Sequence, residues 1–365
     1  MQKRGADGFS SSRPACVAQA MPGIGGKDEM TSKELAKLLG VSQSTVSRSL
    51  NGSSLVKGET AERIRAVAKE YGYEINSNAK SLKTNSTGTI GVVFPDHFID
   101  FDSNIYIGNL FNCIRNHLQA HGYDLLALGG HEPEDKISGV ERVIRNRKVD
   151  GLIVIESSIS QDRWYETGHP VPIIRYNPEQ AGAEERSTVA VDHHHGGEVL
   201  GEYLGRCGHK RILCVSAMEK MGAIRLREQG IRDGLKKYGV ILEPKQFLHG
   251  DLTFESGYRA VMEHKDMFRD YTAVCAYNDA MALGVMEALK ELQIRIPDQI
   301  SVTGFDGLKI GAWFRPRLTT VSMPGQEIAE QCCRLLYAKL RGEEGEGIRP
   351  KILPQLIIRE SSGPV

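Results

Sequence analysis

The chain has 365 residues, and at about 100–200 residues per domain this length predicts two or three domains. It carries 46 Lys and Arg against 46 Asp and Glu, so its formal net charge is zero, and 40% of its residues are hydrophobic. This composition argues against a histone-like polycation and an acidic disordered chain. The sequence contains no run of about 18 apolar residues, so no membrane span is predicted.

The first 29 residues are rich in Gly, Ser, Ala and Pro and show no hydrophobic period, which predicts a disordered tail over 1–29. Arg13 and Pro14 interrupt the stretch that comes nearest to the apolar core of a secretory signal. The seven cysteines contain no Cys-x-x-Cys pair, as is typical of thiols in a reducing compartment. We therefore expect a cytoplasmic protein, and Met30 is a second candidate for the start of translation.

Helix signals begin directly after the tail. Thr31 and Glu34 have the spacing of a capping box, and Gly40 is placed to end the helix that follows. Ser42 is expected to cap a second helix, and apolar spacing predicts a third over 59–71. The sequence therefore predicts a small three-helix unit.

The spacing of Ala36, Gly40 and Val46 favours a helix-turn-helix, in which two helices cross steeply at a small residue and a turn glycine. An ordinary helical hairpin is the alternative. Short or bidentate hydrogen-bonding side chains on the outward face of the second helix favour DNA, because they suit base edges and phosphates in a major groove. They are Gln43, Ser44, Ser47 and Arg48.

Charge along the chain is uneven. Residues 30–88 carry nine Lys or Arg and five Glu, a net charge of +4, and residues 1–29 carry +1. The remaining 89–365 must then carry −5. The zero net charge is thus a cancellation, and the basic segment has the electrostatic footprint expected of a protein that binds a phosphate backbone.

Strand-length apolar runs alternate with helical spacing throughout 89–365. This alternation predicts parallel sheets with helices on both faces, and about 275 residues indicate two such lobes. A ligand would then lie in the crevice that faces the carboxyl ends of the strands.

Three segments resemble the lactose/galactose-repressor family of bacterial transcription regulators. They are residues 41–51 (VSQSTVSRSLN), residues 78–82 (NAKSL) and residues 89–93 (TIGVV). The resemblance implies an all-α helix-turn-helix head joined through a hinge to a two-lobed α/β core of the type I periplasmic-binding-protein-like fold, with doubly wound parallel sheets. The implied domains are a head over 30–75, a hinge helix and linker over 76–88, and a core over 89–365 with lobe crossovers near 190 and 323.

The resemblance also implies which residues contact DNA. Gln43, Ser44 and Arg48 would read bases, and Leu82 would be an apolar wedge that enters the minor groove, with Ala79 and Lys80 beside it. From the residues alone, a simple hydrophobic residue in a linker is the favoured interpretation of Leu82. Ile75 precedes the hinge asparagine where the family often has proline. The expected DNA contacts are Thr31, Gln43, Ser44, Thr45, Ser47, Arg48, Asn51, Ala79, Lys80 and Leu82.

Polar residues at the ends of predicted strands are the candidates for effector binding. Asn278 and Asp279 follow one strand and Asp306 closes another, while Arg227 lies in a helical segment similar to the arginine-containing helix of the family. Arginine, asparagine and aspartate together can hold vicinal hydroxyls, although Asn278 and Asp279 are also the kind of residue that caps a helix. The expected effector contacts are Asp96, Arg227, Leu252, Asn278 and Asp306.

Leu252 stands where several relatives have a stacking aromatic, which weakens any purine assignment. The run Asp192-His193-His194-His195 is better explained as a loop entering a helix than as a metal site. No G-x-S-x-G or H-E-x-x-H motif is present, so hydrolase chemistry lacks a nucleophile or a metal pair. We expect no metal, no cofactor and no enzymatic activity.

Together these observations predict a transcription regulator, most simply a repressor, that acts as a homodimer on a near-palindromic operator. A small-molecule effector, a sugar or sugar derivative, would control its affinity for DNA. A protein co-effector, a tetramer, and an effector acting as inducer or co-repressor are all compatible with the sequence. The rival classes are an extracytoplasmic solute-binding protein, which would need an export signal and no DNA-binding head, and an enzyme on an α/β scaffold.

Overall fold

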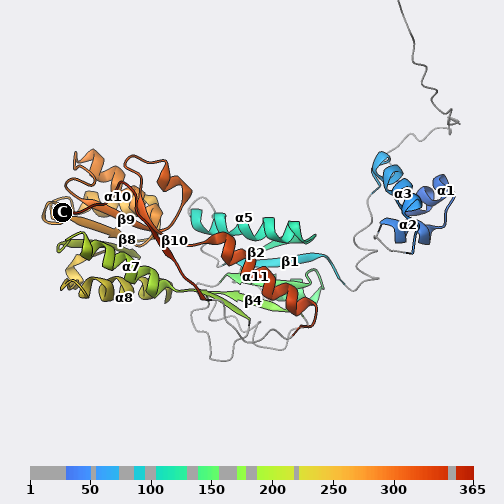
Figure 1. The fold of residues 1–365 in the computed structure, drawn as a ribbon, viewed down its shortest axis with the longest axis horizontal. Coiled ribbons are helices and arrows are strands. Elements are labelled where there is room, and N and C mark those ends of the chain that lie inside the picture. Colours follow the sequence, from blue (N-terminus) through green and yellow to red (C-terminus); the bar gives the residue numbers. More distant parts are fainter. Residues whose placement is uncertain are drawn as a thin grey trace, which may run out of the picture. The chain divides into compact units, whose positions relative to one another are not determined.

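The computed structural model describes residues 30–50, 55–73, 86–94, 104–129, 139–155, 171–177, 187–217, 222–343 and 351–365. The chain divides into two compact units, Met1–Lys80 and Ser81–Val365 (Figure 1). Within the described ranges, no helix has the length and apolar character needed to cross a membrane. The six described cysteines are free thiols, and those at 214, 275, 332 and 333 are buried.

The first unit contains three helices, α1 (Ser32–Leu39), α2 (Gln43–Leu50) and α3 (Gly58–Glu70). The predicted capping box is confirmed, because the Thr31 side chain accepts from the Glu34 amide and the Glu34 carboxylate accepts from the Thr31 amide. Gly40 ends α1 at φ 65°, a left-handed conformation that costs glycine little. These local signals set the angle at which α2 leaves α1.

A small apolar core holds the three helices together. Leu35, Val46 and Ile64 are fully buried, and each comes from a different helix. At the rim, the Arg63 guanidinium donates to the Leu39 carbonyl at 2.8 Å, which ties α3 to the end of α1. The outer face of α2 takes no part in this core and remains available to a partner.

The first lobe of the second unit is a six-stranded sheet of order β11-β5-β4-β3-β1-β2, parallel throughout. Alternation in β1 places Ile90 and Val92 against α5 and α11, while Val93 packs with α6 on the opposite face. The sheet is therefore wound on both faces. Its elements are β1 (Thr89–Phe94), α5 (Ile105–Ala120), β2 (Asp124–Gly129), α6 (Gly139–Arg145), β3 (Gly151–Ile155), β4 (Ile173–Tyr176), β5 (Thr188–Val191), α11 (Gly325–Leu340) and β11 (Lys351–Ile352).

The second lobe has the sheet order β12-β10-β9-β8-β6-β7, and α7 and α8 lie on one side of it while α10 lies on the other (Figure 1). All its strands are parallel except β12, which runs antiparallel to β10. Its elements are α7 (His193–Arg206), β6 (Ile212–Ala217), α8 (Gly222–Lys236), β7 (Phe247–Gly250), α9 (Phe254–Glu263), β8 (Ala273–Ala276), α10 (Asp279–Glu291), β9 (Ser301–Asp306), β10 (Thr319–Ser322) and β12 (Gln355–Ile357), with short 3-10 turns at Pro244–Gln246, Met267–Asp270 and Lys309–Ala312.

The chain passes between the two sheets three times. It crosses from β5 to α7 at Asp192, from β10 to α11 at 323–324, and from β11 to β12 at 353–354. The sequence indicated only the first two passages, because β11 and β12 are two and three residues long. All three passages lie beside one another at the junction of the lobes, where the Asp192 amide donates to the Ile352 carbonyl at 2.9 Å.

Candidate DNA-binding surface and effector site

The outer face of α2 carries the predicted base-reading residues. Gln43, Ser44 and Arg48 are exposed. The Gln43 amide donates to the Ser32 hydroxyl at 2.7 Å, which orients it across the junction of α1 and α2, and the Ser44 hydroxyl bonds Ser42 at 2.7 Å. The Gln43 and Ser44 side chains are therefore held in defined orientations on the same helix as the cationic Arg48.

Two other predicted DNA contacts also have hydrogen-bonded hydroxyl groups. The Thr31 hydroxyl is occupied by the capping box, and the Thr45 hydroxyl bonds Ser42 at 2.8 Å. Ser47 is half-buried on the same helix. Four further predicted contacts lie outside the described residues, namely Asn51, Ala79, Lys80 and Leu82, as does Ile75.

In the second unit, Arg227 of α8 is the centre of a buried polar cluster. Its Nη2 lies 3.4 Å from the Asp306 carboxylate, both side chains being less than 10% exposed. Its Nη1 donates to the Tyr277 carbonyl at 2.6 Å, and its Nε lies 3.3 Å from His193 Nδ1. The guanidinium also lies 4.0 Å above the Phe305 ring. Arg227 thus joins the ends of β8 and β9 to the start of α7.

Asp306 ends β9 in an unusual backbone conformation. Its φ is 123°, a region that non-glycine residues rarely adopt and that is often found at functional sites. Its carbonyl accepts from the Met323 amide at 3.0 Å, next to the second passage between the lobes. Burial raises the pKa of the Asp306 carboxyl to about 6, while the neighbouring Arg227 charge opposes that rise.

Two more predicted effector residues meet one another directly after β8. Asn278 caps α10 by accepting from the Met281 amide at 2.8 Å, and its side-chain NH₂ donates to the Leu252 carbonyl at 2.7 Å. Leu252 itself adopts a positive φ of 69°. Because Tyr277 precedes Asn278, this pair and the Arg227–Asp306 pair are adjacent. Asp96 lies outside the described residues.

Asp279 has a different role from the helix cap considered above. It is completely buried, accepts from the Leu308 amide at 2.6 Å, and accepts from the Thr320 hydroxyl. Burial and the nearby Asp306 charge raise its pKa well above the usual range. Asp279 therefore holds the loop after β9 against β10 rather than facing a ligand.

His193 connects the arginine cluster to the first lobe, a role that the sequence did not reveal. Its Nε2 lies 2.9 Å from the Asn177 amide nitrogen, and Asn177 Oδ1 accepts from the Val191 amide at 2.8 Å. Arg227 Nε faces the other ring nitrogen. A neutral imidazole accepts at only one nitrogen, so His193 can satisfy one of these two neighbours at a time.

The remaining histidines of the run confirm that it enters a helix. Asp192 caps α7 by accepting from the His195 amide at 3.0 Å, and His194 bonds Asp233 of α8 at 2.9 Å. No group of three or more His, Cys, Asp or Glu side chains in the described ranges is placed to hold a metal ion.

A tyrosine pair and an apolar cluster complete the junction. The hydroxyls of Tyr106 and Tyr176 lie 2.5 Å apart, and burial raises the pKa of both. Two charges of the second lobe also act on the Tyr106 hydroxyl: Asp306 raises its pKa and Arg227 lowers it.

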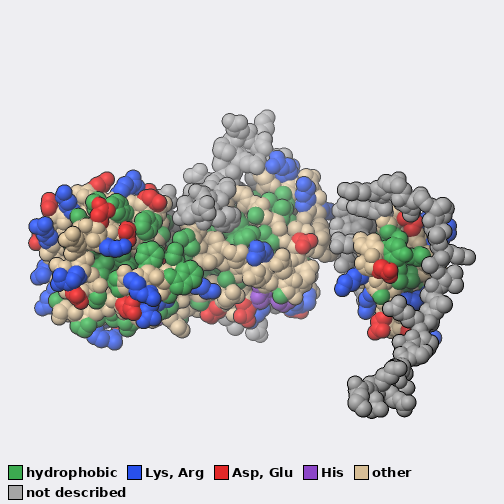
Figure 2. Space-filling model, turned by 90° about the horizontal axis from the view of Figure 1, so that it is seen from above, with side chains coloured by type: hydrophobic (Ala, Val, Ile, Leu, Met, Phe, Trp, Pro, Cys, Tyr) green, Lys and Arg blue, Asp and Glu red, His purple; other side chains and the backbone are tan. Residues whose placement is uncertain are grey.

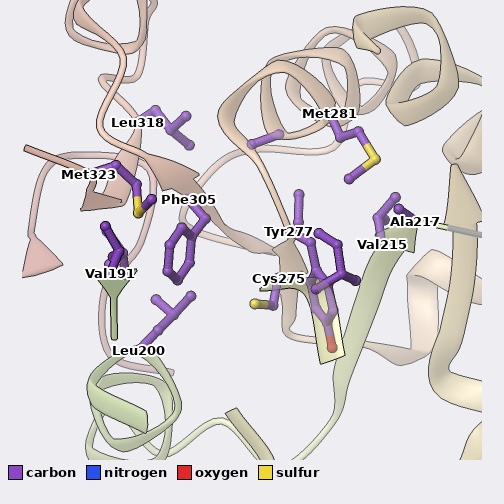
Figure 3. Close-up of a cluster of buried hydrophobic side chains, with 14 of the residues drawn as sticks. Val191, Leu200, Val215, Ala217, Cys275, Tyr277, Met281, Phe305, Leu318 and Met323 are labelled. Carbon is purple, nitrogen blue, oxygen red and sulfur yellow. The ribbon is translucent and has the colours of Figure 1, made fainter. Parts of the chain in front are cut away.

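An apolar cluster lies beneath Arg227 at the same junction. Figure 3 shows Phe305 lying among Val191, Leu200 and Met323, so apolar side chains from both sides of the passages pack around the ring that Arg227 covers. Tyr176 and Asn177 could have been found as further residues at a strand end.

The buried neutral histidine gives a test by pH. Burial, and then the Arg227 charge, lower the pKa of His193 well below its ordinary value of 6.5. Below about pH 6.5, His193 is protonated in the unfolded chain but stays neutral in the folded chain. The free energy of unfolding therefore decreases as pH falls below about 6.5. We expect His193→Gln to flatten this fall relative to the parent, measured by urea unfolding between pH 5 and 8. Equal slopes for the two proteins would contradict a neutral His193.

Comparison with known proteins agrees with this architecture. Residues 31–76 match the model of bacterial regulatory proteins of the lacI family, and residues 202–362 match the periplasmic binding protein-like domain. The HTH-type transcriptional repressor CytR of Escherichia coli K12 is 31% identical over 335 residues, covering 91% of this chain and 96% of CytR. The chain belongs to the LacI family.

Another member of the LacI family, the transcriptional repressor PurR of Vibrio vulnificus, is 27% identical over 91% of this chain and 98% of its own length. A solved complex of the transcriptional regulator CelR with cellobiose matches with a TM-score of 0.66 and 27% identity over 91% of this chain and 99% of that chain. The lac repressor dimer bound to operator and the anti-inducer ONPF shares the fold, with a TM-score of 0.75 at 24% identity over 92% of this chain and 99% of that chain. The expected fold class is confirmed, and as a LacI-family protein the chain is a DNA-binding transcription regulator.

Proposed function

We propose that this LacI-family protein is a cytoplasmic, non-enzymatic repressor whose homodimer binds a near-palindromic operator under the control of a small-molecule effector. Residues 30–75 would read the DNA, 76–88 would form the hinge, and 89–365 would bind the effector and the second subunit. The observation that most supports effector control is the buried cluster around Arg227. This cluster contacts the ends of β8 and β9 and the start of α7, beside the passages between the lobes.

On the DNA side, α2 would enter the major groove with Gln43, Ser44 and Arg48 toward the bases. Thr31, Thr45 and Ser47 would contact the backbone or neighbouring bases, as would Asn51. Leu82, with Ala79 and Lys80 beside it, would insert at the centre of the operator and bend it.

Replacing Arg48 with alanine tests the reading helix. Arg48 is exposed on α2, and a bidentate contact from arginine to guanine contributes about 1–3 kcal/mol of discrimination. We expect Arg48→Ala to weaken operator binding by that amount and to relax sequence preference, measured by fluorescence anisotropy on operator and random duplexes at one salt concentration. Equal weakening on both duplexes would assign Arg48 to a phosphate instead.

On the effector side, Arg227, Asn278 and Asp306 would hold hydroxyl groups, and Asp96 and Leu252 would be further effector contacts. Because Asp306 matches the charge of Arg227, an uncharged ligand would meet a balanced site, which supports a sugar or sugar derivative over an anion. The CelR complex, which contains cellobiose, supports the same class.

Effector and operator must then affect one another reciprocally, with a coupling of about 1–3 kcal/mol. Thermal-shift screening with sugars, sugar phosphates and nucleosides would find a stabilising ligand. Its affinity is then measured calorimetrically with and without operator DNA, and we expect a difference of about 5–150-fold. Equal affinities would remove the regulatory mechanism, and binding of anionic sugar phosphates alone would overturn the neutral ligand class.

A further inference from the structure

Two histidines that belong to neither the DNA-binding surface nor the effector site lie one helical turn apart near the end of α5. The ring centroids of His117 and His121 are 4.7 Å apart, and the ring planes differ by 22°. Residues four apart share one face of a helix, so both imidazoles project from the same surface, and His121 is exposed. Histidine side chains reach the surface of the second unit on the face shown in Figure 2.

We propose that His117 and His121 chelate a divalent transition-metal cation of the Zn²⁺, Ni²⁺ or Cu²⁺ class, with water completing the coordination. Imidazole nitrogen suits these cations better than Mg²⁺ or Ca²⁺, which prefer oxygen. No third protein ligand stands beside the pair among the described residues. The site is therefore exchangeable, unlike the closed four-ligand sites that stabilise folds.

The hydrogen bonding of His121 presents the correct nitrogen to a metal. Its Nδ1 lies 2.8 Å from the His117 carbonyl oxygen, which accepts only, so Nδ1 carries the proton. The lone pair is then on Nε2, at the outer edge of the ring. Metal-binding histidines commonly donate their second nitrogen to a carbonyl in this way, which fixes the tautomer and the ring orientation.

Aromatic side chains hold both rings in place before any metal arrives. Tyr337 of α11 packs on His121 with centroids 4.8 Å apart and on His117 at 6.3 Å. Tyr123 stacks on Tyr337 at 5.5 Å, and the Tyr337 hydroxyl donates to the His117 carbonyl at 3.5 Å. Since the two helices pack together, the backbone positions of both histidines are fixed before a cation binds.

The test is calorimetric titration of Ni²⁺ into the full chain, free of any affinity tag and treated with EDTA. We expect one site per chain at neutral pH. His117→Ala and His121→Ala should each weaken it at least about tenfold, because each removes the chelate, and the double variant should bind no more weakly than either single variant. His194→Ala/His195→Ala is the matched control, since it removes another pair of neighbouring histidines on a helix, both half-buried, and it should leave this site unchanged.

Cu²⁺ bound to the same protein gives a second readout, by electron paramagnetic resonance. Hyperfine structure from two equivalent nitrogens is expected in the parent and should be lost in either single variant. Unchanged Ni²⁺ affinity in both single variants would overturn the site and leave the pair as aromatic packing. Loss of binding only in the His194/His195 control would overturn it in favour of the start of α7. Both histidines lie at the surface, so circular dichroism should show that all variants fold.

Discussion

Replacing Arg227 with alanine is expected to destabilise the second unit by about 3–5 kcal/mol, because it leaves Asp306 buried without its ion pair. The same change removes the donor to the Tyr277 carbonyl and the cation above Phe305. It should also abolish the response to the effector. Stability is measured by urea unfolding followed through tryptophan fluorescence, which reports only on the second unit because both tryptophans, Trp164 and Trp313, lie there.

The unpaired carboxylate makes a second variant informative. Arg227→Ala/Asp306→Asn removes both charges, so we expect it to be more stable than Arg227→Ala alone. In the single variant the Asp306 pKa should rise further, so its deficit should shrink as pH falls toward 5. A loss below about 1 kcal/mol in the single variant, or strictly additive losses in the double variant, would show that the pair carries little energy.

Replacing Gly230 with alanine is expected to lower the free energy of unfolding by about 3 kcal/mol, the upper end of the usual range for overpacking, because the new methyl group meets backbone atoms. A Cβ at Gly230 would lie 2.0 Å from the His194 carbonyl oxygen, and one at Gly197 would lie 2.2 Å from the Arg227 carbonyl oxygen. Helices α7 and α8 therefore approach so closely that neither tolerates a methyl group. Any separation would also draw Arg227 away from His193, so effector binding should weaken together with stability.

Gly325 provides the matched control for this prediction. It also lies in a helix, but a Cβ there would meet only Cys113 Sγ at 3.5 Å, an ordinary contact. Gly325→Ala should stay within about 0.5 kcal/mol of the parent in the same urea experiment. If Gly230→Ala were equally mild, α7 and α8 would have room to separate and the helix contact would not position Arg227.

The helix-turn-helix was predictable because its determinants are local. Thr31 and Glu34 cap α1 within four residues, and Gly40 ends it through its own backbone conformation. The buried strands β1 and β3 were predictable for a similar reason, since nearly all of their residues are apolar. Short strands such as β5 and β10 carry too few residues to show a period, and only pairing with their neighbours makes them strands.

The effector site was predictable only in part. Arg227, Asn278 and Asp306 were found because strand ends gather at one edge of a parallel sheet and because of the family resemblance. His193 and Tyr106 were missed, since each gains its role from a partner far away in the chain. No residue pattern near His193 predicts its contact with Arg227, because the two residues are 34 positions apart in the chain.

The sequence by itself determined the helix-turn-helix head and the two-lobed core, because composition, capping signals and the division of charge depend only on which residues stand at which positions. A tail of +1, a head of +4 and a core of −5 add up to the zero net charge of the whole chain. Only the tertiary structure decided that the three passages between lobes meet beside one buried arginine, and that α7 and α8 touch through glycines. Those features depend on distances between residues that are remote in the chain, and such distances exist only once the sheets have formed.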